Sequence, residues 1–152
     1  MEYDKETVLE RLCEASSHWR NLEMNIVKLI QNKPDLITHS PASLDLIRQA
    51  EKDLNVLFAK DYVEYVSSFG IAVFNGHELT GICDKKRLDV VRNTREEREL
   101  NPFVPDDWYV LENAGIDGII IWQDKTGRIY QTMPNGQKEY IANSLAEYLD
   151  KQ

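Results

Sequence analysis

The spacing of apolar residues changes near residue 71, and this change limits the fold more than any other feature of the chain. Before it, apolar side chains recur every three or four residues, as on one face of a helix. After it, short apolar runs lie between turn signals such as Asn75-Gly76, as strands do. Helices followed by a run of short strands indicate an α+β domain with an antiparallel β-sheet, rather than a parallel, doubly wound sheet.

The first predicted helix covers residues 5–31, where apolar residues lie alternately four and three apart. These residues are Val8, Leu12, Ala15, Trp19, Leu22, Ile26 and Leu29. Pro34 ends the helix, because proline cannot continue the hydrogen-bond ladder. We expect this long N-terminal helix to pack on the body of the domain, although its heptad spacing leaves a coiled-coil seam as an alternative.

The second predicted helix begins at Ser40, a serine cap followed by Pro41 in the first turn. Its predicted inward face consists of Leu44, Ile47, Ala50 and Leu54. A third helix is predicted from Ala59 to Gly70. Four aromatic residues share one face of this helix: Phe58, Tyr62, Tyr65 and Phe69. A ligand platform and a buried core face are the two interpretations of this stripe.

The second half of the chain predicts the strands 71–74, 79–82, 108–112, 119–123, 128–132 and 138–141. Thr94 and Glu97 have the spacing of a capping box, which predicts a short helix over residues 95–100. A closing helix is predicted from an Asn143 cap. It should bury Leu145, Tyr148 and Leu149.

Length and composition indicate a single domain of ordinary globular character, with 152 residues of which 42% are hydrophobic. The first residues are charged, unlike a signal peptide, and no apolar run is long enough for a membrane span. We therefore expect a cytoplasmic protein without membrane contact, as a monomer or weak dimer. Cys13 and Cys83 lie far apart and outside any CxxC, so neither a disulfide framework nor a zinc ribbon is predicted.

The net charge is −8, which argues against direct binding of nucleic acid, because phosphate contacts need clustered Lys and Arg. Residues 85–98 are an exception, with 6 basic and 3 acidic side chains. A short basic segment of this kind is most often a solvated surface, and we expect that here.

Catalytic patterns are not evident in the sequence. The histidines His18, His39 and His77 have no second ligand at helical spacing, so no metal site is predicted. A thiol–imidazole pair of His77 and Cys83 would lack a third orienting group. No glycine-rich phosphate loop is present. We predict a protein that is not an enzyme and that uses no cofactor.

Two ordered groups of residues resemble the SUKH domain, the superfamily of the yeast cell-wall assembly regulator and bacterial immunity proteins. The first group is Ile47, Ala50-Glu51, Leu54, Leu57–Tyr62, Phe69-Gly70 and Asn75-Gly76. The second is Gly115–Gly118, Asp124, Gly127, Ile129-Tyr130 and Ser144–Leu149. The resemblance covers residues 44–150 and leaves residues 1–34 as an N-terminal helical extension. Ala59 stands where the family usually has proline.

The resemblance implies an antiparallel sheet with helices packed around it, and therefore a buried aromatic stripe. Bacterial SUKH proteins are mostly immunity proteins, which bind and neutralise the toxin domain of a polymorphic secreted toxin. Within the superfamily, the chain is similar to the YobK type of Bacillus, which is paired with an LXG-class toxin. The implied partner is a cognate toxin that is basic, as a nuclease would be. Two alternatives share the fold: an intracellular protein-binding scaffold or regulatory module, and a small-molecule-binding protein or enzyme.

We expect the partner to contact acidic and aromatic side chains on the loops and strand ends of the second half, where binding groups commonly lie. The candidates are Glu78, Asp84, Asp106, Asp107, Trp108, Glu112 and Asp117. Among them, Trp108 follows two acids, and aromatic anchors ringed by polar groups are the usual form of an interface hot spot. A core position for Trp108 is the alternative.

Overall fold

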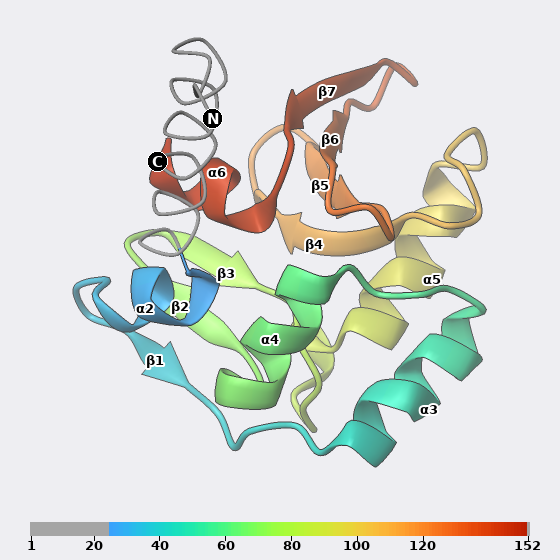
Figure 1. Ribbon diagram of the computed structural model, residues 1–152. Helices are drawn as coiled ribbons and strands as arrows, with labels where there is room; N and C mark the ends of the chain where they lie inside the picture. Colours follow the sequence, from blue (N-terminus) through green and yellow to red (C-terminus); the bar gives the residue numbers. More distant parts are fainter. Residues whose placement is uncertain (1–24, 152) are drawn as a thin grey trace, which may run out of the picture.

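The computed structural model describes residues 25–151, and it contains one antiparallel sheet of seven strands and five α-helices (Figure 1). The strands are β1 (Ile37–Thr38), β2 (Ala72–Phe74), β3 (His77–Leu79), β4 (Tyr109–Asn113), β5 (Ile120–Gln123), β6 (Ile129–Thr132) and β7 (Lys138–Ala142). They lie in the order β1-β2-β3-β4-β5-β6-β7, so each strand pairs with its neighbours in sequence. The predicted α+β class with an antiparallel sheet is confirmed.

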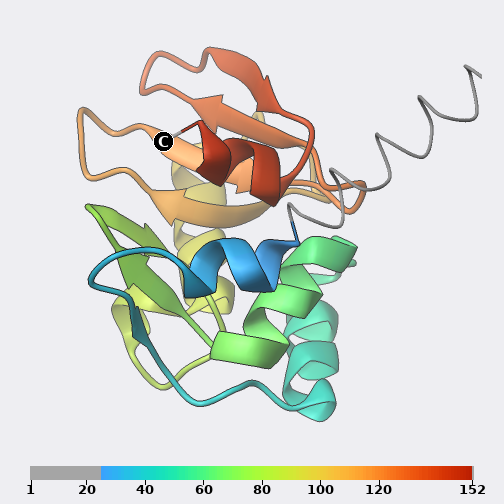
Figure 2. The same cartoon turned by 60° about the vertical axis from the view of Figure 1, so that its left-hand side comes forward.

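The helices are α2 (Ile26–Gln31), α3 (Leu44–Leu54), α4 (Lys60–Phe69), α5 (Val90–Leu100) and α6 (Leu145–Asp150), with a 3₁₀ turn at Lys86–Leu88. α2 packs against both α4 and α6 (Figure 2). The predicted helix before residue 25 lies outside the described residues, as do Cys13 and His18.

The start of α2 interrupts the long helix predicted over residues 5–31. The backbone of Asn25 is extended, and its side chain accepts hydrogen bonds from Val27 N (2.9 Å) and Lys28 N (3.4 Å). Asn25 is therefore an N-cap, and a helix that begins there cannot continue a preceding one. The prediction of one continuous helix was wrong at this residue, whereas its end before Pro34 is confirmed.

α3 begins at Ser43 rather than at the predicted Ser40 cap. The hydroxyl of Ser43 accepts from Leu46 N at 3.2 Å. The preceding residues are extended, because His39 N donates to Phe69 O (3.0 Å) and the chain pairs as β1 with β2. Leu44, predicted to face inward, is 55% exposed, since the shifted start places it in the first turn. The other predicted inward residues, Ile47, Ala50 and Leu54, are buried.

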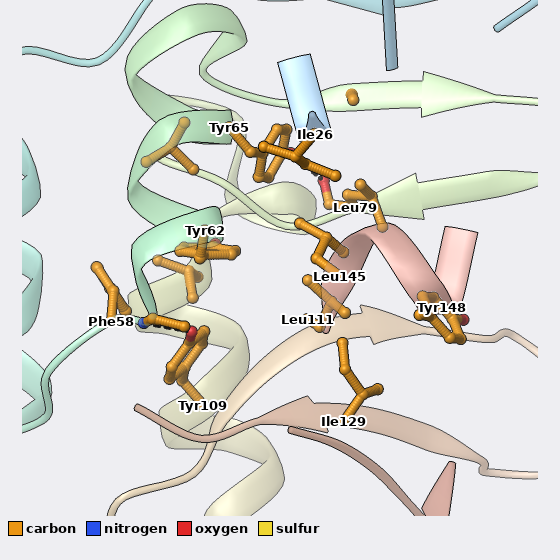
Figure 3. Close-up of a cluster of buried hydrophobic side chains, with 14 of the residues drawn as sticks. Ile26, Phe58, Tyr62, Tyr65, Leu79, Tyr109, Leu111, Ile129, Leu145 and Tyr148 are labelled. Carbon is orange, nitrogen blue, oxygen red and sulfur yellow. Dashed lines mark hydrogen bonds between the residues drawn. The ribbon is translucent and has the colours of Figure 1, made fainter. Parts of the chain in front are cut away.

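The aromatic stripe belongs to the core. Tyr62 and Tyr65 are fully buried and Phe58 is 6% exposed, while Phe69 is partly buried against the same cluster. Figure 3 shows the rings of Phe58, Tyr62 and Tyr65 beside apolar side chains from α2, α6 and the sheet. Both tyrosine hydroxyls are satisfied at Thr80, where Tyr62 Oη lies 3.0 Å from Oγ1 and Tyr65 Oη donates to the carbonyl oxygen at 2.8 Å. The buried face therefore contains no unsatisfied hydroxyl that would need a ligand.

α5 begins at Asp89, so the predicted capping box at Thr94 was wrong. The carboxylate of Asp89 accepts from Arg92 N at 3.1 Å and caps the helix. Thr94 lies inside the helix and is fully buried, and its Oγ1 accepts from Val110 N at 3.0 Å. This amide lies next to an irregularity in β4 between Val110 and Glu112. Thr94 thus satisfies a backbone donor of β4 from a neighbouring helix.

The other predicted strands and the closing helix are confirmed within a few residues, except for the position of one strand and the cap of the helix. The predicted strand over residues 79–82 lies earlier, as β3 (His77–Leu79). The closing helix α6 is capped by Ser144, whose hydroxyl accepts from Glu147 N at 3.0 Å, and not by Asn143. Its inward residues Leu145, Tyr148 and Leu149 are buried as predicted.

The far face of the sheet carries a second, smaller apolar cluster. It consists of Val104, Trp108, Val110, Ile120 and Trp122, with Tyr130 packed against it. The main core lies on the opposite face, beneath α2, α4 and α6. Strands β4 and β5 are therefore buried on both faces, which explains why their sequences read as continuous apolar runs.

Candidate partner-binding surface

The seven candidate residues do not form one surface. Asp106 and Asp107 are exposed and lie just before β4, whereas the exposed Asp117 lies in the loop after it. A strand of five residues spans about 16 Å at about 3.3 Å per residue. The two aspartates and Asp117 thus lie near opposite ends of β4, so the fold separates Asp106 and Asp107 from Asp117.

Glu112 is buried, which removes it from any surface that a partner could touch. It is 3% exposed, and its carboxylate accepts from Tyr148 Oη (2.6 Å), Glu78 N (3.0 Å) and His77 Nδ1 (3.0 Å). A buried carboxylate needs such partners to offset its lost hydration. The prediction of Glu112 as a contact residue is corrected: it is a structural carboxylate.

Trp108 is also buried, at 7% exposure. Its ring stacks on Tyr130 with centroids 4.1 Å apart and an interplanar angle of 12°, and lies 6.4 Å from the ring of Trp122. The core alternative for Trp108 therefore holds. Tyr140 lies at the surface end of this group of rings. It is 50% exposed, and its ring centroid lies 6.1 Å from that of Tyr130.

Glu78 and Asp84 are accessible but paired. Glu78 forms an ion pair with Arg87, which holds the pKa of the Glu78 carboxyl below its usual range. The carboxylate of Asp84, 86% exposed, lies 3.3 Å from His39 Nε2. Both pairs lie at the surface, where solvent screens such contacts and leaves them little net stabilisation. The two acids therefore remain available to an outside partner.

Most basic side chains of residues 85–98 are exposed, as expected, but two of the arginines also form hydrogen bonds within the fold. Arg95 Nη2 donates to Asp53 O (3.2 Å), and Arg98 Nη1 donates to Leu54 O (3.3 Å). These carbonyls belong to the last turn of α3, where basic side chains are favourable. Arg98 also donates to Asp106 O at 2.8 Å, and burial lowers the pKa of its guanidinium. Two arginines of this largely solvated segment thus also cap the end of α3.

Asp61 is the polar centre that sequence reasoning missed. Its carboxylate accepts from Gln123 Nε2 (3.0 Å) and from Leu145 N (2.8 Å), at the start of α6. Gln123 in turn accepts from Tyr109 Oη (2.8 Å), which accepts from Ala59 N (3.0 Å). Burial raises the pKa of Asp61 despite these bonds. An aspartate in the first turn of a helix is ordinary, so only its long-range partners distinguish it.

A hollow of about 260 Å³ lies beside Asp61. Polar groups from three segments line it: Lys60, Glu64, Thr126, Asn143 and Ser144. Both oxygens of Asp61 already accept hydrogen bonds from the protein, so the carboxylate positions α4, β5 and α6 relative to one another.

Residues 23–152 match the family model of the SMI1-KNR4 cell-wall family, SUKH_5. This chain belongs to the SMI1-KNR4 family. Among curated proteins, none matches it. The family match begins before residue 44 and so includes α2 and β1, which agrees with the burial of Ile26 and Ile30 in the main core.

Catalytic groups are not assembled in the described part of this SMI1-KNR4 domain. His77 Nδ1 faces Glu112, while Cys83 Sγ lies 3.5 Å from Lys85 O, and burial raises the pKa of this thiol. Within residues 25–151, no three His, Cys, Asp or Glu side chains come together as metal ligands. Over the same range, none of the helices has the length and apolar character that crossing a bilayer requires.

Proposed function

We propose that this SMI1-KNR4 domain is an immunity protein, which binds and neutralises the toxin domain of a cognate polymorphic secreted toxin. It acts in the cytoplasm as a monomer or weak dimer, without catalysis of its own. The family match over residues 23–152 is the observation that carries this proposal. The finer form of the proposal is a YobK-type protein that neutralises a nuclease of an LXG-class toxin.

The charge of the chain supports a basic partner. The net charge is −8, and a nuclease must present positive charge to its polyphosphate substrate. Complementary charge accelerates association and disfavours wrong partners.

The accessible members of the predicted set are Glu78, Asp84, Asp106, Asp107 and Asp117; because they do not share one surface, we place the proposed interface at Asp106 and Asp107. Asp106 and Asp107 form its centre, since they are adjacent, exposed and immediately before the buried Trp108. A rigid aromatic base beneath polar groups reduces the ordering cost of binding.

The test uses the toxin-like C-terminal domain that the proposal predicts to be encoded beside this gene. Cells that express that domain should survive only when this chain is co-expressed, and the two purified proteins should form a complex. Changing Asp106→Lys and Asp107→Lys together should slow association about tenfold or more at low salt and weaken its salt dependence. Glu112 is left unchanged, because a lysine in its buried position would unfold the domain.

A matched control changes Asp45→Lys and Asp150→Lys, which alters the net charge equally on exposed positions of α3 and α6. This control should retain most of the association rate. The proposed function is overturned if the wild-type chain neither binds the neighbouring toxin-like domain nor protects cells from it. Turnover of a nucleic acid or ester by the purified chain would overturn the proposal that it is not an enzyme.

A regulatory, protein-binding module is the second candidate, and the family's description as a cell-wall family favours it. Such a module would use the same accessible acids to hold an intracellular partner. The protection experiment separates the candidates, because a regulator would not rescue cells from a toxin.

A further inference from the structure

Strand β7 leaves one edge of the sheet unpaired within residues 25–151. It pairs with β6 on one side, and the strand order ends there (Figure 1). The opposite edge, β1, is only two residues long, whereas β7 has five residues and no proline. Short strands and prolines are usual protections of a sheet edge, and β7 has neither; the charged side chains of β7, Lys138 and Glu139, favour a partner of complementary charge over an indiscriminate one.

The turn before β7 determines which backbone groups face outward. Met133 N donates to Gln137 O at 3.0 Å, which makes these residues a hydrogen-bonded pair. Hydrogen-bonded and non-hydrogen-bonded pairs alternate along an antiparallel ladder, and Lys138 is the next residue, paired with Thr132. Lys138 and Tyr140 therefore direct their N–H and C=O groups away from β6, toward the open edge.

Two side chains of β7, Tyr140 and Glu139, suit basic groups, while the ammonium group of Lys138, on the same face as Tyr140, donates to Phe103 O at 3.3 Å. On one face, the half-exposed Tyr140 continues an aromatic row whose inner members are Tyr130 and Trp108. On the other face, the exposed Glu139 accepts from Gln131 Nε2 at 2.7 Å. A tyrosine ring attracts Lys and Arg by a cation–π interaction, and a carboxylate attracts them by charge.

We propose that the basic partner binds at β7 by adding an extended segment to the sheet as an eighth strand. Backbone hydrogen bonds to Lys138 and Tyr140 hold the segment, and its Lys or Arg side chains contact Tyr140 on one face and Glu139 on the other. This inference rests on the proposed function, which supplies a basic partner. A second copy of the chain is a poorer occupant, because each copy carries a net charge of −8.

The aromatic row connects this edge with the acidic residues of the proposed interface. Asp107 directly precedes Trp108, whose ring stacks on Tyr130, and Tyr130 pairs with Tyr140 across β6 and β7. The packed rings of Trp108, Tyr130 and Tyr140 therefore connect the segment of Asp106 and Asp107 with the β7 edge, so that one partner can contact this segment and the edge.

A proline substitution tests the backbone part of the proposal. Lys138→Pro removes an outward N–H, and proline is tolerated at the first residue of an edge strand. Lys138→Thr is the matched control, since it removes the ammonium group and its bond to Phe103 O but keeps the amide. Lys138→Pro should weaken binding of the neighbouring toxin-like domain about tenfold or more, while Lys138→Thr should change it less than about threefold.

Hydrogen–deuterium exchange of the unsubstituted chain tests the same proposal without a variant. The amides of Lys138 and Tyr140 should exchange rapidly in the free protein and slow at least tenfold in the complex. If the wild-type chain binds the toxin-like domain but these amides remain unprotected, or Lys138→Pro binds as well as Lys138→Thr, the edge-strand proposal is wrong and the proposed function stands. If the free protein forms a dimer that Lys138→Pro abolishes, a second copy occupies the edge and the proposal is overturned.

Discussion

The phenol oxygen of Tyr148 lies 2.6 Å from Oε2 of Glu112, and this hydrogen bond joins α6 to β4 inside the protein. The same carboxylate accepts from His77 Nδ1 and from Glu78 N, which both belong to β3. β3 and β4 share only one residue pair, Leu79 with Glu112. The buried carboxylate therefore holds together the two halves of the sheet where their backbone pairing is shortest.

Replacing Glu112 should destabilise the fold strongly. Glu112→Ala leaves the Tyr148 hydroxyl and the Glu78 amide without their acceptor, and we expect the free energy of unfolding to fall by about 3–5 kcal/mol. Urea denaturation followed by circular dichroism measures it. The control Glu139→Ala, on exposed β7, should change stability by less than about 0.5 kcal/mol. Equal stability of both variants would show that Glu112 does not hold the sheet together.

The aromatic stripe should show a gradient of stability effects. Phe58→Ala should cost about 3–5 kcal/mol, because the ring is buried against Tyr62 and Tyr109 at centroid distances of 5.0 and 4.8 Å. Phe69→Ala should cost less, since Phe69 is only partly buried. Thermal and urea unfolding measure both. Neutral stability in both variants would mean that the stripe faces solvent.

Thr94 should matter through its hydroxyl and not as a helix cap. Thr94→Val keeps the shape but leaves the buried Val110 N without an acceptor, which should cost about 1–3 kcal/mol. Thr94→Ser keeps the hydroxyl and should recover most of that loss. The free energies of unfolding of the two variants are compared in urea. A serine variant as unstable as the valine variant would contradict this role.

Asp61 should make stability depend on pH in a defined direction. Burial raises its pKa in the folded state, so that between the unfolded and folded pKa values the folded state binds more protons. The contribution of Asp61 to the free energy of unfolding is therefore largest at acid pH, and it is lost as the pH rises through the pKa of Asp61 in the folded state. The difference in free energy of unfolding between the wild type and Asp61→Asn should decrease from about pH 4 upward and then become constant. Urea unfolding of both proteins at a series of pH values measures this, and a difference that grows with pH would contradict it.

Local sequence signals determined the elements of this protein. Periodicity predicted α4 and the face that carries its aromatic residues, and the turn residues predicted where β2, β5 and β6 end. These predictions hold because they depend on residues within one or two turns of each other. Helix starts were less certain: Ser40, Thr94 and Asn143 were all predicted as caps. Adjacent polar residues can serve equally well, and packing selects among them.

Only the tertiary structure decided which polar residues are accessible. Glu112 and Asp107 are both acidic residues at the predicted strand, yet Glu112 is enclosed by Tyr148 and His77 while Asp107 faces solvent. Asp61 gained its role from Gln123, 62 residues away in sequence. The sequence by itself determined the α+β class, the common helix face of the four aromatic residues and the acidic character, which depend on composition and short-range spacing. The tertiary structure decided burial and long-range hydrogen bonds, because these depend on which distant segments the fold brings together.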